Sequence, residues 1–435
     1  MALSKTPYKG TRDFFPKDKR AQNYLFQNMT KTAESFGFEP YDGPLLEEVE
    51  LYKAKSGEEL INEQIYSFTD RGDRFVAIRP EMTPTLARMV AQIHREYPKP
   101  IRWYSIPNLY RYEKPQKGRL REHWQFNCDI FGAPENEGEI EILQVLISLL
   151  NNYGANESHF EILLNDRRMV DDIFVKLMKL PTEVCYKLYK IVDRAKKVTT
   201  EAVQKMVSEL NIGKTNEEIF FQYLKLETFS DAISFLRKNS FNDTANVFEK
   251  FISTITELKL ENYLKYDPAI VRGLDYYTGI VFECFDKNPE NRRAICGGGA
   301  YAELLKIFNE PSLPGVGFGL GDVTLKDFLE VHNLIKNFDH PENDICLFYT
   351  DDAAKIDLYQ FAHGLRKQGL KVTTHLEPIN LKKIFTIAEK KGAKLVGFIG
   401  EDELKNKTIQ IKNLKTKEQT NHSLTNDFDK IKKLI

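Results

Sequence analysis

A short loop rich in arginine and lysine, between two strand-like segments, is the part of the chain best suited to chemistry. Residues 101–132 read IRWYSIPNLYRYEKPQKGRLREHWQFNCDIFG. Trp, Tyr, Phe and Ile at both ends predict strands over 101–110 and 124–131, and KPQKGR between them is a turn sequence. Arginine forks bind phosphate oxygens in pairs, so this pattern favours a phosphate site; a solvated basic hairpin is the alternative. The basic side chains are Arg102, Arg111, Lys114, Lys117, Arg119 and Arg121.

Two other segments carry side chains suited to a small polar substrate. In RPEMTP, Glu81 and Thr83 stand at the start of a predicted helix, where they could simply cap it. A carboxylate is also a sensible partner for an α-ammonium group. In RGLDYYTG, one arginine and two tyrosines fall between strand-like residues 270–271 and 280–285. A hairpin with exposed aromatic side chains is the alternative there.

Composition limits the classes of protein that remain. The 435 residues are too many for one compact core and indicate two to three domains. The formal net charge of −1 means that a nucleic-acid surface would have to be a local patch. The five cysteines are scattered without a Cys-x-x-Cys pair, which argues against a zinc site or a disulfide framework. No apolar run is long enough to span a bilayer, so we expect a cytoplasmic protein without a membrane partner.

The elements that must position these residues follow from periodicity. Helices are predicted over 19–36 and 139–153, a hairpin over 65–79, and a strand over 159–165. From 166 to 258 the segments are helical in period and nearly free of glycine, which indicates a helical insertion. Beyond a turn-rich stretch near 338–344, strands and helices alternate, which predicts a small α/β domain.

Several of these segments together resemble one enzyme family. YRYEKPQKGRLREHWQFNCDIFG resembles motif 2 of the class II aminoacyl-tRNA synthetases, and histidyl-tRNA synthetases in particular. RGLDYYTGIVFE resembles the segment that separates histidyl enzymes from other class II synthetases. GFEPYDGPLLEEVELY is similar to motif 1, which forms dimers, and LPGVGFGLGDVTL is similar to motif 3.

The resemblance implies a multidomain α/β fold, in which helices flank the antiparallel sheet of class II synthetases. A catalytic core would occupy 1–165, with motifs 1 and 2, and 259–332, with the histidine motifs and motif 3. The helical insertion would occupy 166–258, a linker 333–343, and an anticodon-binding α/β domain 344–435.

The implied reaction is ATP-dependent ligation of L-histidine to tRNA(His) through a histidyl-adenylate, in a homodimer. Arg111 and Arg272 would act as the catalytic cations at the α-phosphate of ATP. Glu113 and Arg119 would hold the rest of ATP, with Mg²⁺ on the phosphates and no metal ligated by the protein alone. The resemblance assigns these residues to the histidine pocket: Glu81, Thr83, Gln125, Asp129, Arg272, Tyr276 and Tyr277.

The chain departs from the family pattern at several positions. Met82 stands where glycine is usual, Asp129 replaces a glutamate, and Ala300 and Ala302 replace an arginine and an aspartate. Thr324 stands where motif 3 normally has an arginine that reaches adenine and the γ-phosphate. Arg119 or Arg121 could supply the missing cation.

These departures favour a rival hypothesis, a non-catalytic histidyl-synthetase-like regulatory subunit of histidine biosynthesis. The arginines of motif 2, the complete RGLDYYTG segment and the C-terminal domain argue against it. A generic RNA-binding protein would explain fewer of these features.

Overall fold

The computed structural model describes residues 3–54, 60–271, 277–291 and 293–435. The chain divides into two compact units. The first comprises Met1–Asp13 and Gln22–Ile335, and the second comprises Phe14–Ala21 and Lys336–Ile435. Within the described ranges, no helix is both long and apolar enough to cross a membrane.

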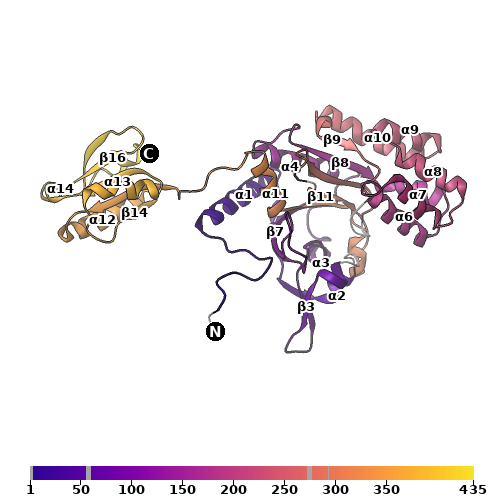
Figure 1. Cartoon of the computed structure of the whole chain (residues 1–435), viewed down its shortest axis with the longest axis horizontal. Helices are drawn as coiled ribbons and strands as arrows, with labels where there is room; N and C mark the ends of the chain where they lie inside the picture. Colours follow the sequence, from indigo (N-terminus) through magenta and orange to yellow (C-terminus); the bar gives the residue numbers. More distant parts are fainter. Residues whose placement is uncertain (1–2, 55–59, 272–276, 292) are drawn as a thin grey trace. The chain divides into compact units, whose positions relative to one another are not determined.

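A large mixed sheet forms the centre of the first unit (Figure 1). Its strands follow the order β1-β5-β7-β12-β11-β10-β8-β9, and β6 pairs with β7. The pairings β1–β5 and β8–β9 are parallel, and the others are antiparallel. The strands are β1 (Glu39–Pro40), β5 (Ile101–Ser105), β6 (Asn108–Tyr110), β7 (Glu122–Phe131), β8 (Phe160–Asp166), β9 (Leu264–Tyr266), β10 (Ile280–Asp286), β11 (Ala294–Tyr301) and β12 (Gly315–Gly321).

One face of this sheet is covered by helices and holds the main core. Helix α4 (Glu137–Asn152) packs on β7 and β12, and α11 (Asp322–Val331) packs on β7, β11 and β12. Nine residues of α4 are buried. A helix that is buried over so much of its surface needs apolar residues on more than one narrow stripe, which explains its nearly continuous apolar sequence. Helix α1 (Pro16–Ser35) adds Leu25, Met29 and Ala33 to the same core.

A smaller sheet with the order β2-β4-β3 belongs to the same unit. Its strands are β2 (Leu46–Glu48), β3 (Tyr66–Thr69) and β4 (Phe75–Ile78), and the accompanying helices are α2 (Val49–Lys53), a π-helical turn over Leu60–Gln64, and α3 (Thr83–Ile93). Helix α3 begins with Thr83 and Pro84 at its first two positions, where proline costs no hydrogen bond. This start fixes Glu81 and Thr83 next to the large sheet.

The segment between β8 and β9 is helical throughout its described elements, which are α5 (Arg167–Asp171), a π-helix over Asp172–Leu177, α6 (Thr182–Ala195), α7 (Thr200–Ser208), α8 (Lys214–Leu224), α9 (Phe229–Lys238), α10 (Asn242–Glu257) and a 3₁₀ turn over Glu261–Tyr263. The predicted strand at residues 270–271 is wrong. The chain instead pairs at β9, because Leu264 and Tyr266 bury their side chains against β8.

The second unit contains a sheet with the order β14-β13-β15-β16-β17, in which β13 pairs in parallel with β14 and β15. Its strands are β13 (Asn343–Tyr349), β14 (Val372–Thr374), β15 (Ala393–Ile399), β16 (Thr408–Asn413) and β17 (Gln419–Ser423). Its remaining elements are a 3₁₀ turn over Asp352–Ala354 and helices α12 (Lys355–Lys367), α13 (Leu381–Lys390), α14 (Glu401–Asn406) and α15 (Phe428–Lys432). In the first unit, a further 3₁₀ turn over Leu304–Phe308 lies between β11 and β12.

Candidate active site

The floor of the site is the face of the large sheet opposite α4. Strand β12 contributes no side chains to this face. Along GVGFGLG, Val316, Phe318 and Leu320 are buried in the core. Strand alternation therefore turns every glycine of β12 to the other face. The register places Gly317 opposite Asp129 and Gly319 opposite Asn127 on β7. Side chains of β7 can thus lie across β12, where any larger residue would occupy their space.

Gln125 and Asp129 use this space. A Cβ added at Gly319 would lie 2.4 Å from Gln125 Nε2, and one added at Gly317 would lie 2.1 Å from Asp129 Oδ1. Both added atoms would be far inside normal contact distance. Gln125 Nε2 donates to Asn127 Oδ1 at 2.7 Å, which orients the amide. Gln125 and Asp129 therefore share one face of β7, as their even spacing predicts.

Asp129 is a buried carboxyl with an unusual acidity. Its side chain accepts a hydrogen bond from Tyr301 Oη at 2.5 Å, and only 6% of the residue is exposed. Burial disfavours the carboxylate, and the tyrosine only partly compensates, so the pKa of Asp129 rises to about 7. The group can thus gain or lose a proton near neutral pH, as imidazole can.

Aromatic and acidic residues enclose the same end of the site. The ring of Tyr277 lies against Gly299 of β11, where an added Cβ would be 2.9 Å from its Cδ1. Tyr277 also packs against the small hydrophobic cluster that includes Leu86 of α3. Glu81 is buried just before α3, and Thr83 is half-buried at its start. Arg272 and Tyr276 lie outside the described residues.

A cavity of about 230 Å³ adjoins this pocket along the sheet. Its walls are formed by Arg111, Glu113, Gly118, Arg119, Leu120, His123, Gln125, Ala294, Ile295, Cys296, Gly297, Gly319, Gly321, Val323 and Thr324. Arg111 Nε donates to the Pro80 carbonyl at 2.8 Å, which ties motif 2 to the segment before α3. Arg119 Nε lies 3.4 Å from Glu113 Oε2. The four predicted motif 2 and pocket residues Arg111, Glu113, Arg119 and Gln125 therefore line one cavity.

His123 belongs to this cavity but was not predicted from the sequence. Burial, then the guanidinium groups of Arg111 and Arg12, lower the pKa of His123 to about 3. The ring is consequently a neutral, flat surface at physiological pH. Its position two residues before Gln125 on one strand was the available signal, because alternate residues share a face.

The start of the chain holds motif 2 against motif 3. Arg12 Nη2 donates to Asp322 Oδ2 at 2.8 Å, and Asp322 Oδ1 accepts from the Trp124 backbone N–H at 2.9 Å. Asp322 is the first residue of α11, where a carboxylate is favoured by the helix dipole. Burial raises the pKa of Asp322, and Arg12 opposes that rise.

Arg121 points away from the cavity. Its Nε donates to the Glu113 carbonyl at 3.2 Å and its Nη1 to Tyr8 Oη at 2.6 Å. Its guanidinium carbon also lies 4.1 Å from the centre of the Tyr112 ring. These contacts commit Arg121 to bracing the loop rather than to a ligand.

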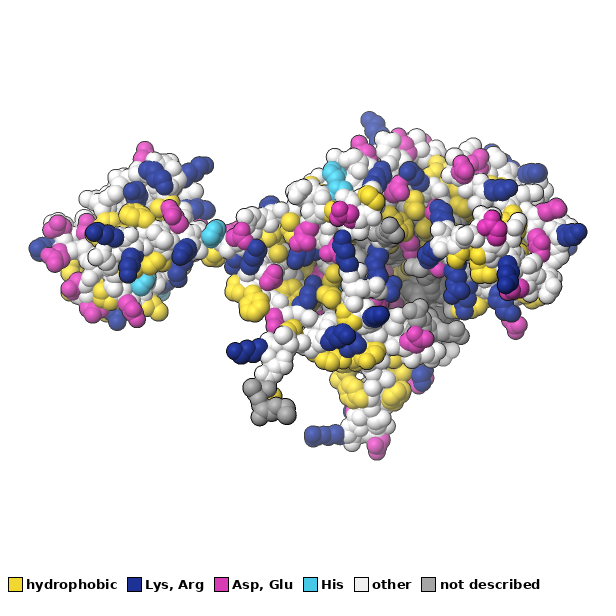
Figure 2. Space-filling view, viewed as in Figure 1, with side chains coloured by type: hydrophobic (Ala, Val, Ile, Leu, Met, Phe, Trp, Pro, Cys, Tyr) yellow, Lys and Arg dark blue, Asp and Glu magenta, His cyan; other side chains and the backbone are white. Residues whose placement is uncertain are grey.

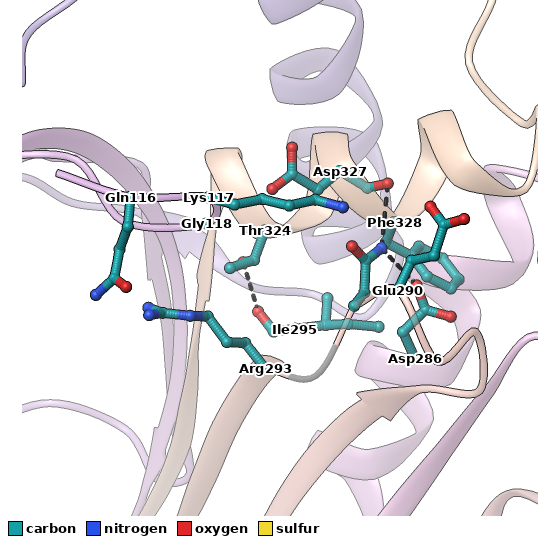
Figure 3. A pocket seen from close by; sticks show the side chains of 11 residues that line it. Gln116, Lys117, Gly118, Asp286, Glu290, Arg293, Ile295, Thr324, Asp327 and Phe328 are labelled. Carbon is teal, nitrogen blue, oxygen red and sulfur yellow. Dashed lines mark hydrogen bonds between the residues drawn. The ribbon is translucent and has the colours of Figure 1, made fainter.

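Thr324 stands where neighbouring cavities meet. A second cavity, of about 240 Å³, lies beyond Gly118 and Thr324 and is shown in Figure 3. The Thr324 hydroxyl donates to the carbonyl of Ile295 at 2.8 Å. Arg293, just before β11, also lines this cavity. It was not predicted from the sequence, because no motif surrounds it.

A larger hollow of about 560 Å³ extends from this point toward the helical segment. Its lining includes Arg119 and Arg293, the acidic residues Asp193, Asp267 and Glu283, and Lys196 and Lys197, just after α6. Figure 2 shows basic and acidic side chains interspersed over the visible face of the molecule. Asp267 and Asp193 pair with these two lysines and offset their charge, so the positive charge that favours a phosphate group lies at Arg119 and Arg293.

Comparisons with known proteins agree with this geometry. The family model of histidyl-tRNA synthetase matches residues 10–324, and that of the anticodon-binding domain matches residues 345–434. The chain is 41% identical to the histidine–tRNA ligase of Leptospira biflexa, over 99% of this chain and 98% of that protein. It is 37% identical to the histidine–tRNA ligase of Thermoplasma volcanium, over 94% of each chain. Its fold is similar to the crystal structure of histidyl-tRNA synthetase from Nostoc sp. PCC 7120, with a TM-score of 0.82, 23% identity and complete coverage of both chains.

Proposed function

The chain belongs to the histidyl-tRNA synthetase family, and from that premise we propose that it ligates L-histidine to tRNA(His) at the expense of ATP. It is thus a class II aminoacyl-tRNA synthetase, and the fold predicted from the sequence is confirmed. The single observation that supports this function best is the continuity of two sites on one sheet face. A glycine-floored pocket with Gln125 and Asp129 opens beside a cavity lined by Arg111 and Arg119.

The first step would form histidyl-adenylate. An oxygen of the histidine carboxylate attacks the α-phosphorus of ATP, the bond to the bridging oxygen breaks, and pyrophosphate leaves with both electrons. Negative charge grows on phosphoryl oxygens, so fixed cations lower the barrier more than acids or bases do. We assign this role to Arg111 and, through the resemblance of RGLDYYTG, to Arg272.

The histidine side chain would lie in the pocket of β7. Gln125 and Asp129 supply hydrogen-bond partners for the imidazole nitrogens, and Tyr276 and Tyr277 supply its walls. Glu81 and Thr83 would receive the α-ammonium group. A site with such buried polar groups rejects apolar amino acids by roughly 10⁴-fold, because the polar groups would be left unpaired.

ATP would extend from this pocket along the adjoining cavity of about 230 Å³. Glu113 and Arg119 would contact its adenine and phosphate end, and ATP would enter as its magnesium complex. The neutral ring of His123 offers a flat surface in the same cavity.

In the second step, a hydroxyl of the terminal ribose of tRNA would attack the histidyl carbonyl and release AMP. We propose that residues 344–435 read the anticodon, that 166–258 form the helical insertion, that 333–343 form the linker, and that 1–165 and 259–332 form the catalytic core. We further propose a cytoplasmic homodimer.

Histidine-dependent exchange between ATP and pyrophosphate tests the first step, and charging of tRNA(His) tests the second. We expect both activities in the purified protein. A folded protein without exchange at saturating ATP, histidine and Mg²⁺ would instead fit the regulatory subunit, which Ala300, Ala302 and Thr324 favoured at the outset. The anticodon-binding domain and the similarity of the whole chain to ligases support the enzyme.

A further inference from the structure

Arg293 lies beside the position at which motif 3 lacks its arginine. A Cβ added at Gly118 would lie 3.3 Å from Arg293 Cδ and 3.7 Å from Thr324 Cγ2, so both side chains approach one point. Figure 3 shows Arg293 extending beneath Thr324 toward the loop that carries Gly118. The two residues come from different segments, because Arg293 immediately precedes β11 and Thr324 lies in helix α11.

The guanidinium of Arg293 is poorly satisfied within the protein. Its Nη1 is buried and has no hydrogen-bond partner among the residues that the structure describes. In those same ranges, no carboxylate reaches Arg293 within ion-pair distance. Burial and the nearby Arg119 lower the pKa of Arg293, and the carboxylate of Glu113 opposes this shift. Two neighbouring cations with an unsatisfied donor favour the binding of an anion.

The arrangement of the cavities indicates which part of a bound nucleotide would reach Arg293. Arg111 and Arg119 line the cavity that includes Gln125, and Arg119 and Arg293 line the hollow beyond it. Arg119 therefore lines both cavities, whereas Gln125 and Arg111 line the first and Arg293 lines the second. A nucleotide whose α-phosphate lies at Arg111 would place its outer phosphates near Arg119 and Arg293.

We propose that Arg293 binds the β- and γ-phosphates of ATP and supplies the cation that Thr324 cannot. The Thr324 hydroxyl is already committed to two main-chain carbonyls, those of Ile295 and Gly321. Arg121 is committed to Tyr8 and Tyr112. This inference rests on the proposed function and names a residue for it that lies outside the recognised motifs.

Titration calorimetry with ATP and with AMP, both in the presence of Mg²⁺, tests this role on the full chain. AMP has the adenine and the α-phosphate but lacks the outer phosphates. Arg293→Ala and Arg293→Gln should weaken ATP binding by about tenfold or more, the scale of one hydrogen bond to a charged group, and should leave AMP binding unchanged. Arg237→Ala removes an exposed arginine of α9 and serves as the matched control, which should alter neither.

A second arginine offers a rescue. Thr324→Arg added to Arg293→Ala should restore ATP affinity, because the two side chains approach the same point. In exchange assays, Arg293→Ala should raise KM for ATP and spare kcat and KM for histidine, as the loss of uniform binding does.

Equal weakening of ATP binding and AMP binding would overturn the proposal, because Arg293 would then contact the adenine base or have a purely structural role. Unchanged ATP affinity with a raised KM for tRNA would overturn it in favour of a tRNA phosphate. An inactive wild-type protein would contradict the proposed function instead, and the ATP and AMP comparison would still decide the role of Arg293.

Discussion

The bare floor of the histidine pocket can be tested by adding one methyl group at Gly317. In Gly317→Ala, the new Cβ would lie 2.1 Å from Asp129 Oδ1 and 2.6 Å from the Cys128 carbonyl oxygen. Ordinary contact begins near 3.4 Å, so the carboxylate oxygen would have to retreat by about 1.3 Å. A misplacement on the order of 1 Å in a positioned group can cost about 100-fold in rate.

Histidine-dependent exchange measured against both substrates is the appropriate assay. We expect Gly317→Ala to lower kcat/KM for histidine by about 100-fold and to leave ATP affinity, measured by calorimetry, near the wild-type value. Circular dichroism would establish that the variant folds.

Gly297→Ala on the neighbouring strand is the matched control for Gly317→Ala. Its new Cβ would meet Glu283 Cγ and the Phe282 carbonyl oxygen at an ordinary 3.5 Å, so KM for histidine should not change. If Gly317→Ala used histidine as well as the control does, the steric argument for the pocket would be refuted.

Two other predictions follow from the site and the domain organisation. Because burial raises the pKa of Asp129 from 3.8 to about 7, the folded protein keeps a proton that the unfolded chain loses, and stability falls as pH rises between those values. Asp129→Asn removes this pH-dependent loss of stability, which is worth at most on the order of 4 kcal/mol. The Tm of the variant minus that of the wild type should therefore be larger at pH 8 than at pH 4. An equal difference at both pH values would contradict the raised pKa of Asp129. A chain ending at Asn337 should retain exchange activity if it folds but charge tRNA poorly, and wild-type charging by that chain would exclude the anticodon role of the C-terminal unit.

Local patterns predicted most of the elements around the site. The helix expected over 19–36 is α1 (Pro16–Ser35), and the one expected over 139–153 is α4 (Glu137–Asn152). The strand expected over 101–110 is divided into β5 and β6, which pair with different parts of β7. Pro107 lies at the break, where its missing N–H interrupts the ladder. Its carbonyl still accepts from the Gln125 N–H at 3.1 Å.

Residues that meet only through the tertiary fold were harder to predict. Arg293 is close to Thr324 because β11 pairs with β12, after which α11 begins. That proximity follows from the order of the strands in the sheet, which local sequence patterns do not predict. The motif 2 residues were easier to predict, because Arg111 and Gln125 belong to one hairpin and are close in sequence. Tertiary pairing thus limits which members of a site can be found from sequence alone.

The glycines of β12 show how a local pattern gains its meaning from register. Alternation in GVGFGLG predicts that Val316, Phe318 and Leu320 share one face, and they do lie in the core. Pairing with β7 then sets Gly317 and Gly319 against Asp129 and Asn127. Shifting this pairing by one residue would turn the core side chains into the site and close the space that Gln125 and Asp129 occupy. The same hydrophobic burial that fixes the sheet therefore also keeps the substrate pocket open, and mutations that loosen the α4 side of β12 should affect histidine binding without touching the pocket.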